Sequence, residues 1–286
     1  MKKTLFAKVF TVLSMVACVG LMSCGQKKAD DANAEEGPAK PKVLVIYYSQ
    51  TGATKTLAEE VQKQLGADIE ELQCEVPYEG DFQATIQRCQ EEMADGEYPA
   101  MKSLAANLVD YDVIFLGYPV WFGTYARPIG GLLRSQSFDG MKVVPFCTCG
   151  SGGIEDSFND LRAAMEGTEV PNGFGVRNAR ASQDAAAVVK RYLIENGYLE
   201  GEVEPLAAFG EHHPVTDEEK AIYHEACDDY MYPFGSPVDV ASRGISNGTE
   251  YEFAAISADG RSLIYVTKPA DGEKPYFSRV VRQNAK

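Results

Sequence analysis

The sequence predicts an α/β fold, a five-stranded doubly wound parallel sheet followed by a small C-terminal α+β domain. Between residues 42 and 197, short apolar runs alternate with stretches of helical periodicity, as in repeated strand–helix units. Beyond residue 215, one amphipathic helix precedes four strands of alternating polarity. The intervening segment 198–215 lacks periodicity and is rich in Glu and Pro, so we expect a linker there.

Each expected element of the first domain, residues 42–197, has its own pattern. Apolar runs predict strands at residues 43–48, 68–73, 113–118, 143–146 and 170–179. Helical periodicity predicts helices at residues 55–65, 81–94, 154–165 and 183–196. Because parallel strands point the same way, their carboxyl ends share one edge of the sheet, and ligands bind at that edge in folds of this class.

The segment after the first strand predicts a phosphate site. It consists of Ser49, Gln50, Thr51, Gly52, Ala53 and Thr54. A helix start offers unpaired N–H groups and a partial positive charge, to which the hydroxyls can add further donors. Gly52 lets the backbone approach a ligand closely, and the missing lysine of a P-loop favours a single phosphate, as in a mononucleotide. An ordinary capped helix is the alternative interpretation.

Two further strand ends predict contacts to a flat aromatic ring. The second segment consists of Pro119, Val120, Trp121, Phe122 and Gly123, which we interpret as an aromatic loop. The third segment consists of Cys147, Thr148, Cys149, Gly150, Ser151 and Gly152, which are small enough to bring backbone amides against a ring. A phosphorylated, flat, aromatic cofactor fits all three segments, and FMN is the simplest choice. A core position for Trp121 is the alternative.

These segments resemble the flavodoxin family, and in particular its flavodoxin-like reductase relatives. The resemblance rests on residues 48–54, 111–124 and 145–152, and it extends over about residues 42–197. It implies that the first segment holds the FMN phosphate, that the second lines the isoalloxazine ring, and that the third contacts the pyrimidine edge of that ring.

The third segment departs from the family in one respect. Many flavodoxins place a second aromatic residue there, whereas residues 147–153 contain none. The resemblance then implies a ring face open to a small substrate, to NAD(P)H or to a quinone. We therefore expect an FMN-dependent oxidoreductase that acts in electron transfer. A pure one-electron carrier and a cofactor-free interaction protein are the alternatives.

Residues 1–23 resemble a bacterial lipoprotein signal peptide. A lysine-rich start precedes an apolar run over residues 9–22, and Cys24 follows. The resemblance implies that Cys24 is acylated, that residues 24–41 form a polar tether, and that the protein is lipid-anchored in the bacterial cell envelope. The apolar run is too short to span a bilayer comfortably. A plain secretory signal and an uncleaved anchor are the alternatives.

Composition excludes several kinds of function. A formal net charge of −15 disfavours nucleic-acid binding. Five of the seven cysteines lie beyond Cys24, and an odd number gives no complete disulfide framework. We interpret Cys147 and Cys149 as packing residues, because a C-x-C spacing strains a disulfide. The three histidines show no metal-ligand spacing, so we expect no metal and assign no catalytic residue.

The second domain, residues 216–286, is expected to place one helix across an antiparallel sheet. The helix covers residues 216–231, the strands are expected at 237–245, 251–257, 263–267 and 276–282, and hairpin turns at 246–248 and 258–261. This arrangement, with residues 248–253, resembles the cystatin-like fold. Residues 243–247 do not match the inhibitory hairpin of cystatins, so the resemblance implies an accessory or interaction domain.

Overall fold

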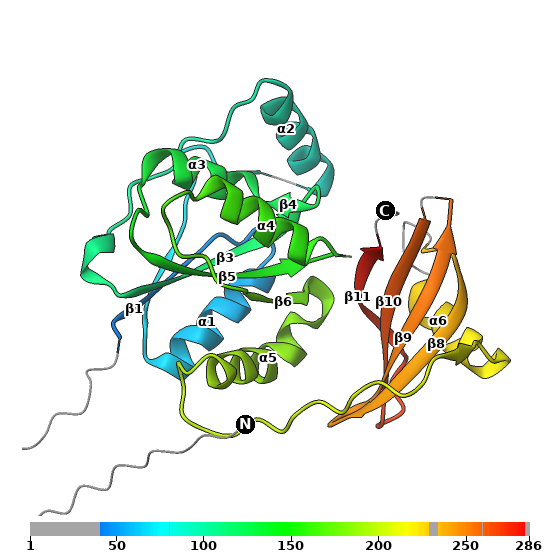
Figure 1. Ribbon diagram of the computed structural model, residues 1–286. Coiled ribbons are helices and arrows are strands. Elements are labelled where there is room, and N and C mark those ends of the chain that lie inside the picture. Colours follow the sequence, from blue (N-terminus) through cyan, green and yellow to red (C-terminus); the bar gives the residue numbers. More distant parts are fainter. Residues whose placement is uncertain (1–40, 80, 151, 229–233, 259, 284–286) are drawn as a thin grey trace, which may run out of the picture. The chain divides into compact units, whose positions relative to one another are not determined.

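The computed structural model describes residues 41–283 except 80, 151, 229–233 and 259, and this part contains two sheets (Figure 1). The first sheet has the order β2-β1-β3-β5-β6, and every pair along it is parallel. Its strands are β1 (Val43–Tyr47), β2 (Asp68–Glu71), β3 (Val113–Trp121), β5 (Lys142–Cys149) and β6 (Phe174–Arg177). The predicted five-stranded doubly wound parallel sheet is therefore confirmed.

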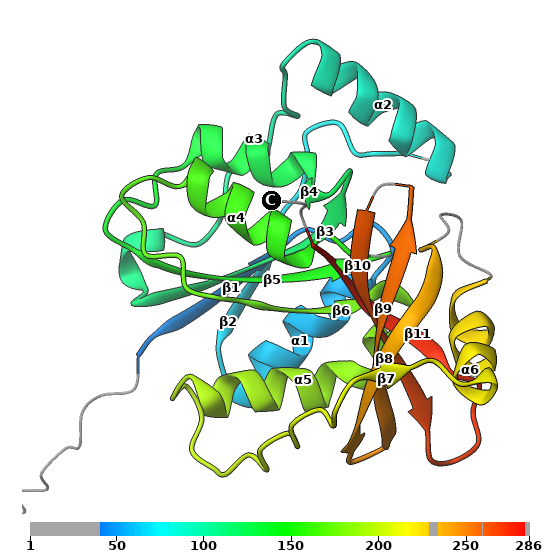
Figure 2. The same ribbon diagram turned by 45° about the vertical axis from the view of Figure 1, so that its right-hand side comes forward.

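Helices cover both faces of this sheet, as Figure 1 and Figure 2 show. One face packs against α1 (Ala53–Leu65) and α5 (Ala181–Glu195), and the other packs against α3 (Arg127–Ser135) and α4 (Ile154–Ala164). Because both faces are covered, all five residues of β1 are buried, which explains why its sequence is a continuous apolar run. Helix α2 (Phe82–Ala94) also belongs to this region. Asp81 caps its start, because the Asp81 carboxylate accepts the N–H groups of Gln83 and Ala84.

Helix α3 was not among the expected elements, because it contains two adjacent glycines. Glycine is a poor helix former, so the pair weakens the local helical pattern. The structure gives a reason for both residues. A Cβ atom at Gly130 would lie 2.0 Å from the Tyr98 ring, and one at Gly131 would lie 2.3 Å from the Pro99 carbonyl oxygen. The connection that precedes η1 (Leu108–Asp110) therefore packs directly on the backbone of α3.

In the parallel sheet, β3 and β5 are longer than expected, and β1, β2 and β6 are shorter. Strand β3 continues through Trp121 and turns into β4 (Thr124–Tyr125), with which it pairs antiparallel. The segment that we interpreted as an aromatic loop is therefore mostly a β-hairpin. Strand β5 includes residues 147–149, because Cys147 and Thr148 pair with both β3 and β6, and Cys149 pairs with β6. Strand β6 covers only four residues, since it pairs with β5 over that length alone.

The second sheet is antiparallel throughout, with the order β11-β10-β9-β8-β7. Its strands are β7 (His213–Pro214), β8 (Ser236–Ile245), β9 (Gly248–Ser257), β10 (Gly260–Pro269) and β11 (Tyr276–Gln283). Helix α6 (Asp217–Cys227) begins with a capping box between Thr216 and Glu219, and its apolar face joins the core of this sheet. The predicted helix and four strands are present, although the last three residues of the predicted helix, 229–231, lie outside the described residues.

The segment that we expected to be a linker contains β7 and packs partly on the second sheet. The ring of Phe209 lies 6.0 Å from the ring of Tyr265, and the Gly210 N–H donates to the Ser242 carbonyl at 2.9 Å. His212 contacts the carboxylates of Asp239 and Glu252. These contacts hold the end of the linker on strands β8 to β10.

Replacing Gly130 with Ala should destabilise the protein, even though Ala favours helices. The new Cβ would meet the Tyr98 ring, which cannot retreat easily because the guanidinium of Arg127 lies 3.8 Å from its centroid. Overpacking of this kind costs about 1–3 kcal/mol of the free energy of unfolding. Urea unfolding measures this loss.

Gly244→Ala is the control, because no heavy atom lies within 4 Å of a Cβ at that position. Its effect should stay below about 1 kcal/mol. A loss for Gly130→Ala as small as that of the control would contradict the close contact between α3 and Tyr98.

Candidate functional site

The carboxyl ends of β1, β3 and β5 meet at one edge of the parallel sheet (Figure 1). The register places Tyr47 beside Gly117, and Gly117 beside Phe146. Each strand then leads into one of the three segments that the sequence predicts as a site. We call them the phosphate turn (residues 49–54), the aromatic hairpin (the predicted residues 119–123 together with β4, residues 124–125) and the third loop (residues 147–152). The fold therefore brings all three together.

The phosphate turn leads directly into helix α1. Gly52 precedes the helix with a φ of 91°, a conformation that favours glycine, and no heavy atom lies within 4 Å of the place of a Cβ. The Ser49 hydroxyl oxygen accepts the N–H groups of Gly52 and Lys55 at 3.1 and 3.2 Å. The first turn of α1 contains no acidic residue. The helix start therefore presents N–H groups and a partial positive charge at an uncrowded surface.

The side chains of Thr54 and Gln50 form hydrogen bonds with other groups of the protein. Thr54 is buried, and its hydroxyl lies 2.8 Å from the Thr148 hydroxyl, which ties α1 to β5. The Gln50 amide accepts the Tyr48 hydroxyl and donates to the Tyr78 carbonyl at 3.1 Å. The structure thus pairs the Thr54 hydroxyl with Thr148, and a contact of Thr54 with a ligand stays a prediction. Of the predicted hydroxyl donors, Thr51 is exposed.

The aromatic hairpin turns at Phe122 and Gly123. Both have positive φ, 52° and 82°, as in the tight turns that join two strands. Phe122 is the one non-glycine residue with positive φ in the part of the chain that the structure describes. Such a conformation costs about 1–2 kcal/mol for a residue with a Cβ. The Phe122 side chain is nevertheless 52% exposed, so contacts of its ring do not account for this conformation, which the turn between β3 and β4 itself requires.

Trp121 belongs to an aromatic cluster beneath this turn. Its ring lies 5.7 Å from the Tyr48 ring and 5.2 Å from the Tyr78 ring, both edge to face. Trp121 is half-buried against the hydrophobic core of this sheet face. Trp121 is thus packed on the core, while its contact with a cofactor ring stays a prediction.

The third loop is available to a ligand only from Gly150 onward. Cys147, Thr148 and Cys149 are buried residues of β5. Burial raises the pKa of the Cys149 thiol to about 11 and also raises the pKa of Cys147, so both thiols are protonated at neutral pH. Both are free cysteines. The side chains of residues 147–149 therefore pack within the fold. The structure does not support a contact between these side chains and a ligand.

The rest of the third loop leads to helix α4. The Gly150 carbonyl accepts two hydrogen bonds from the Arg177 guanidinium, at 3.1 and 3.0 Å. Ser151 lies outside the described residues, and Gly153 precedes the helix with a φ of 82°. A contact of the backbone of this loop with a flavin ring stays a prediction.

Tyr78 is a residue of this region that the sequence analysis missed. It lies between β2 and α2 in a segment without periodicity or motif, so no sequence pattern marks it. The ring is buried against Trp121 and Tyr48, and its hydroxyl donates to Glu92 at 2.5 Å. Burial, together with this hydrogen bond, raises the pKa of Tyr78 far above its ordinary value.

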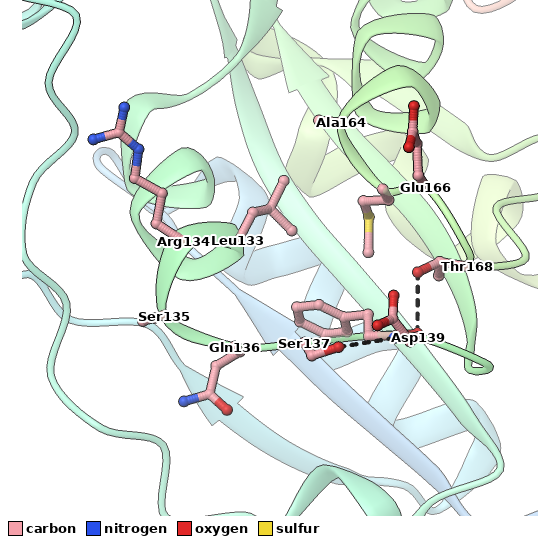
Figure 3. A pocket seen from close by; sticks show the side chains of 11 residues that line it. Leu133, Arg134, Ser135, Gln136, Ser137, Asp139, Ala164, Glu166 and Thr168 are labelled. Atoms are coloured by element: carbon pink, nitrogen blue, oxygen red, sulfur yellow. Dashed lines mark hydrogen bonds between the residues drawn. The ribbon is translucent and has the colours of Figure 1, made fainter.

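A separate hollow of about 380 Å³ lies at the C-terminal ends of α3 and α4, where β5 begins (Figure 3). Hydrogen bonds join residues of its lining. Thr168 donates to the Phe138 carbonyl at 3.0 Å, and the Asp139 N–H donates to the Ser137 hydroxyl. It lies at the opposite end of β5 from the three segments, so we do not assign the site to it. Within the residues that the structure describes, no cluster of His, Cys, Asp and Glu could hold a metal ion.

Solved structures of flavoproteins resemble this chain. A provisionally named flavoprotein of Bacteroides eggerthii DSM 20697 is 31% identical, over 54% of this chain and 96% of that chain, with a TM-score of 0.47. Another, from Bacteroides uniformis ATCC 8492, is 28% identical, over 54% and 99%, with a TM-score of 0.48. A flavoprotein of Lactobacillus acidophilus NCFM, solved in complex with FMN, is 24% identical, over 51% and 99%, with a TM-score of 0.44.

The chain has no match among curated proteins. The family model described as Flavodoxin matches residues 42–192, just over half of the chain and nearly the whole of the parallel sheet with its helices. This match does not extend to the second sheet, for which the resemblance to cystatins stays a prediction. The geometry of the three strand ends and the family match agree, and the chain belongs to the flavodoxin family.

Proposed function

We propose that this protein binds FMN and acts as an oxidoreductase in electron transfer. The observation that carries the proposal is the uncrowded helix start after β1, which lies at the same sheet edge as the exposed, strained Phe122. A phosphate and a flat ring of one ligand would require these two features. Membership of the flavodoxin family and the FMN complex of the Lactobacillus acidophilus flavoprotein support the proposal.

The residues of the phosphate turn fit a single phosphate group. Ser49 accepts two N–H groups through its hydroxyl oxygen, so its own proton is left to donate to an anion. The N–H groups of Ala53 and Thr54 belong to the first turn of α1, where the helix offers no carbonyl acceptors. This donor set would hold a phosphate without a bound cation.

The aromatic hairpin and the third loop would enclose the ring. Trp121 of β3 and Phe122 of the turn that follows would line it, and the third loop would form the rim. FMN supplies the redox chemistry when bound, by transfer of one electron or of a hydride. The chain binds and orients the cofactor and limits the access of water. No aromatic side chain occurs in residues 147–153, and this favours access of a small donor such as NAD(P)H or of a quinone.

We also propose that the protein is exported and anchored in the bacterial cell envelope by lipid on Cys24. The support is the sequence pattern of residues 1–24, which lie outside the described residues. None of the helices in the described part of the chain is long and apolar enough to cross a membrane. In this proposal, acyl chains on Cys24 supply the attachment to the membrane.

Ser49→Ala should weaken the binding of FMN more than that of riboflavin. A hydrogen bond to a charged group contributes about 1.5–3 kcal/mol, so the dissociation constant for FMN should rise about tenfold or more. Riboflavin lacks the phosphate, so its affinity should stay nearly constant. Isothermal titration of both ligands measures the difference.

Thr56→Ala is the matched control for this experiment. Its hydroxyl belongs to the same helix and donates to the Gly52 carbonyl at 3.1 Å, away from the proposed phosphate. Equal losses for FMN and riboflavin in Ser49→Ala would contradict the phosphate assignment.

Phe122→Gly should have opposite effects on folding and on binding. Glycine removes the conformational cost of positive φ, so the free energy of unfolding of the cofactor-free protein should rise by up to about 1 kcal/mol. The protein should then unfold at a higher urea concentration. Loss of the ring should reduce FMN affinity by about 1–3 kcal/mol, the range for aromatic stacking. Phe82→Ala is the control, since Phe82 is an exposed phenylalanine at the start of α2. Unchanged FMN affinity in Phe122→Gly would exclude a contact between Phe122 and the ring.

Cys24→Ala should release the protein from membranes of the cell that produces it. Each buried CH₂ group contributes about 0.8 kcal/mol, and two or more acyl chains give stable attachment. Membrane fractionation and intact-mass measurement check this expectation. A wild-type protein without added acyl mass would refute the anchor and leave the proposal for FMN untouched.

A further inference from the structure

The connection between β2 and α2 contributes a residue to the site through Tyr78. Its three polar or aromatic groups reach three different elements. The carbonyl accepts the Gln50 amide of the phosphate turn at 3.1 Å, and the ring meets Trp121 of β3 at 5.2 Å and 71°. The hydroxyl donates to Glu92 of α2 at 2.5 Å. Because edge-to-face contact is directional, the position of the Tyr78 ring limits the positions open to the Trp121 ring.

Glu92 holds Tyr78 in this position as the centre of an ionic cluster. Its side chain is only 14% exposed and accepts the Arg88 Nε at 2.9 Å. The Arg127 Nε lies 3.8 Å from the same carboxylate, and an Arg127 terminal nitrogen donates to the Glu92 carbonyl at 3.2 Å. One carboxylate therefore connects α2 with the start of α3.

Arg88 closes the cluster from the other side of the tyrosine ring. Its guanidinium carbon lies 3.8 Å from the Tyr78 ring centroid, and the same group donates to the carbonyls of Val76 and Pro77 at 2.9 and 2.8 Å. The ring of Tyr78 is thus held by Arg88 on its face, by Trp121 at an edge contact and by Glu92 at its hydroxyl.

A partly buried ionic cluster costs more free energy than apolar side chains that fill the same space. Removing charges from water costs several kcal/mol per ion, and apolar residues of similar volume often pack at no loss of stability. The charged groups here fix orientations, since each hydrogen bond holds one group of Tyr78 or of its neighbours in position. The cluster therefore contributes more to the position of the Tyr78 side chain than to the stability of the protein.

We propose that Tyr78, held by Glu92, is a positioning residue that sets the orientation of Trp121 for contact with the flavin ring. This inference rests on the proposed binding of FMN. It assigns the β2–α2 connection and helix α2 a role in the site, in addition to the three strand ends.

Tyr78→Phe and Glu92→Gln test the proposal, with Glu91→Gln as the control. Tyr78→Phe keeps the ring and the carbonyl and removes only the hydroxyl. Glu91 is the exposed neighbour of Glu92 on α2 and accepts a hydrogen bond from Gln87. Trp121 is the only tryptophan of the chain, so its emission reports its surroundings directly in the cofactor-free protein. We expect longer-wavelength emission and stronger acrylamide quenching in Tyr78→Phe and Glu92→Gln, and neither change in Glu91→Gln.

Affinities for FMN and riboflavin give the second measurement. Because Trp121 would contact the ring, Tyr78→Phe should weaken both ligands equally, by about tenfold. In a Trp121→Ala background, Tyr78→Phe should produce no further loss. Urea unfolding of each variant establishes that it is folded under the titration conditions.

Several outcomes would overturn the inference. Unchanged tryptophan emission in both variants would do so, as would a loss confined to FMN, which would indicate action through the phosphate turn. Equal losses with and without Trp121 would reduce Tyr78 to a structural residue. If the wild-type protein binds no flavin, the proposed function fails, while the emission of the cofactor-free variants still decides whether Tyr78 positions Trp121. If Tyr78→Phe does not fold, Glu92→Gln carries the same measurements.

Discussion

Strands β1, β3 and β5 are buried on both faces of the parallel sheet, and the other features of the site depend on this burial. A strand between two helical layers has no room for unpaired polar groups, so polar residues can gather only at its ends. Parallel register then places the ends of all three strands at one edge. The start of α1 lies at that edge because its connection to β1 is short.

The site combines elements of different rigidity. The phosphate turn is fixed by Ser49 and by the pair of buried hydroxyls that joins α1 to β5. The aromatic hairpin is fixed from below by the cluster of Tyr48, Tyr78 and Trp121. The tip of the hairpin is different, since Phe122 is exposed and strained. A well-packed base with one exposed aromatic ring at its rim, carried on backbone with positive φ, suits a ligand that is bound through a phosphate at one end and contacted along the face of a ring.

The sequence patterns predicted the sheet well, because continuous apolar runs are the direct consequence of two-sided burial. Helix α3 escaped prediction because close packing against Tyr98 requires glycine where a helical pattern would show larger residues. At the site, the sequence placed the three segments correctly, while side-chain directions could not be read from it. The Thr54 side chain points inward, where its hydroxyl pairs with that of Thr148 on β5. Tyr78 contacts Trp121 from a segment that is distant in sequence. Contacts of that kind arise only when the tertiary structure forms.

The five cysteines of the described chain are all buried and free. Burial raises the pKa of Cys74, Cys89 and Cys149 to about 11 and that of Cys227 to about 12, and it raises the pKa of Cys147 as well. Because thiolates are the species that oxidants and alkylating reagents attack, these five thiols should stay reduced in the folded protein without a protecting reductant. The unfolded chain lacks this protection, so its cysteines should react with oxidants far faster than those of the native state.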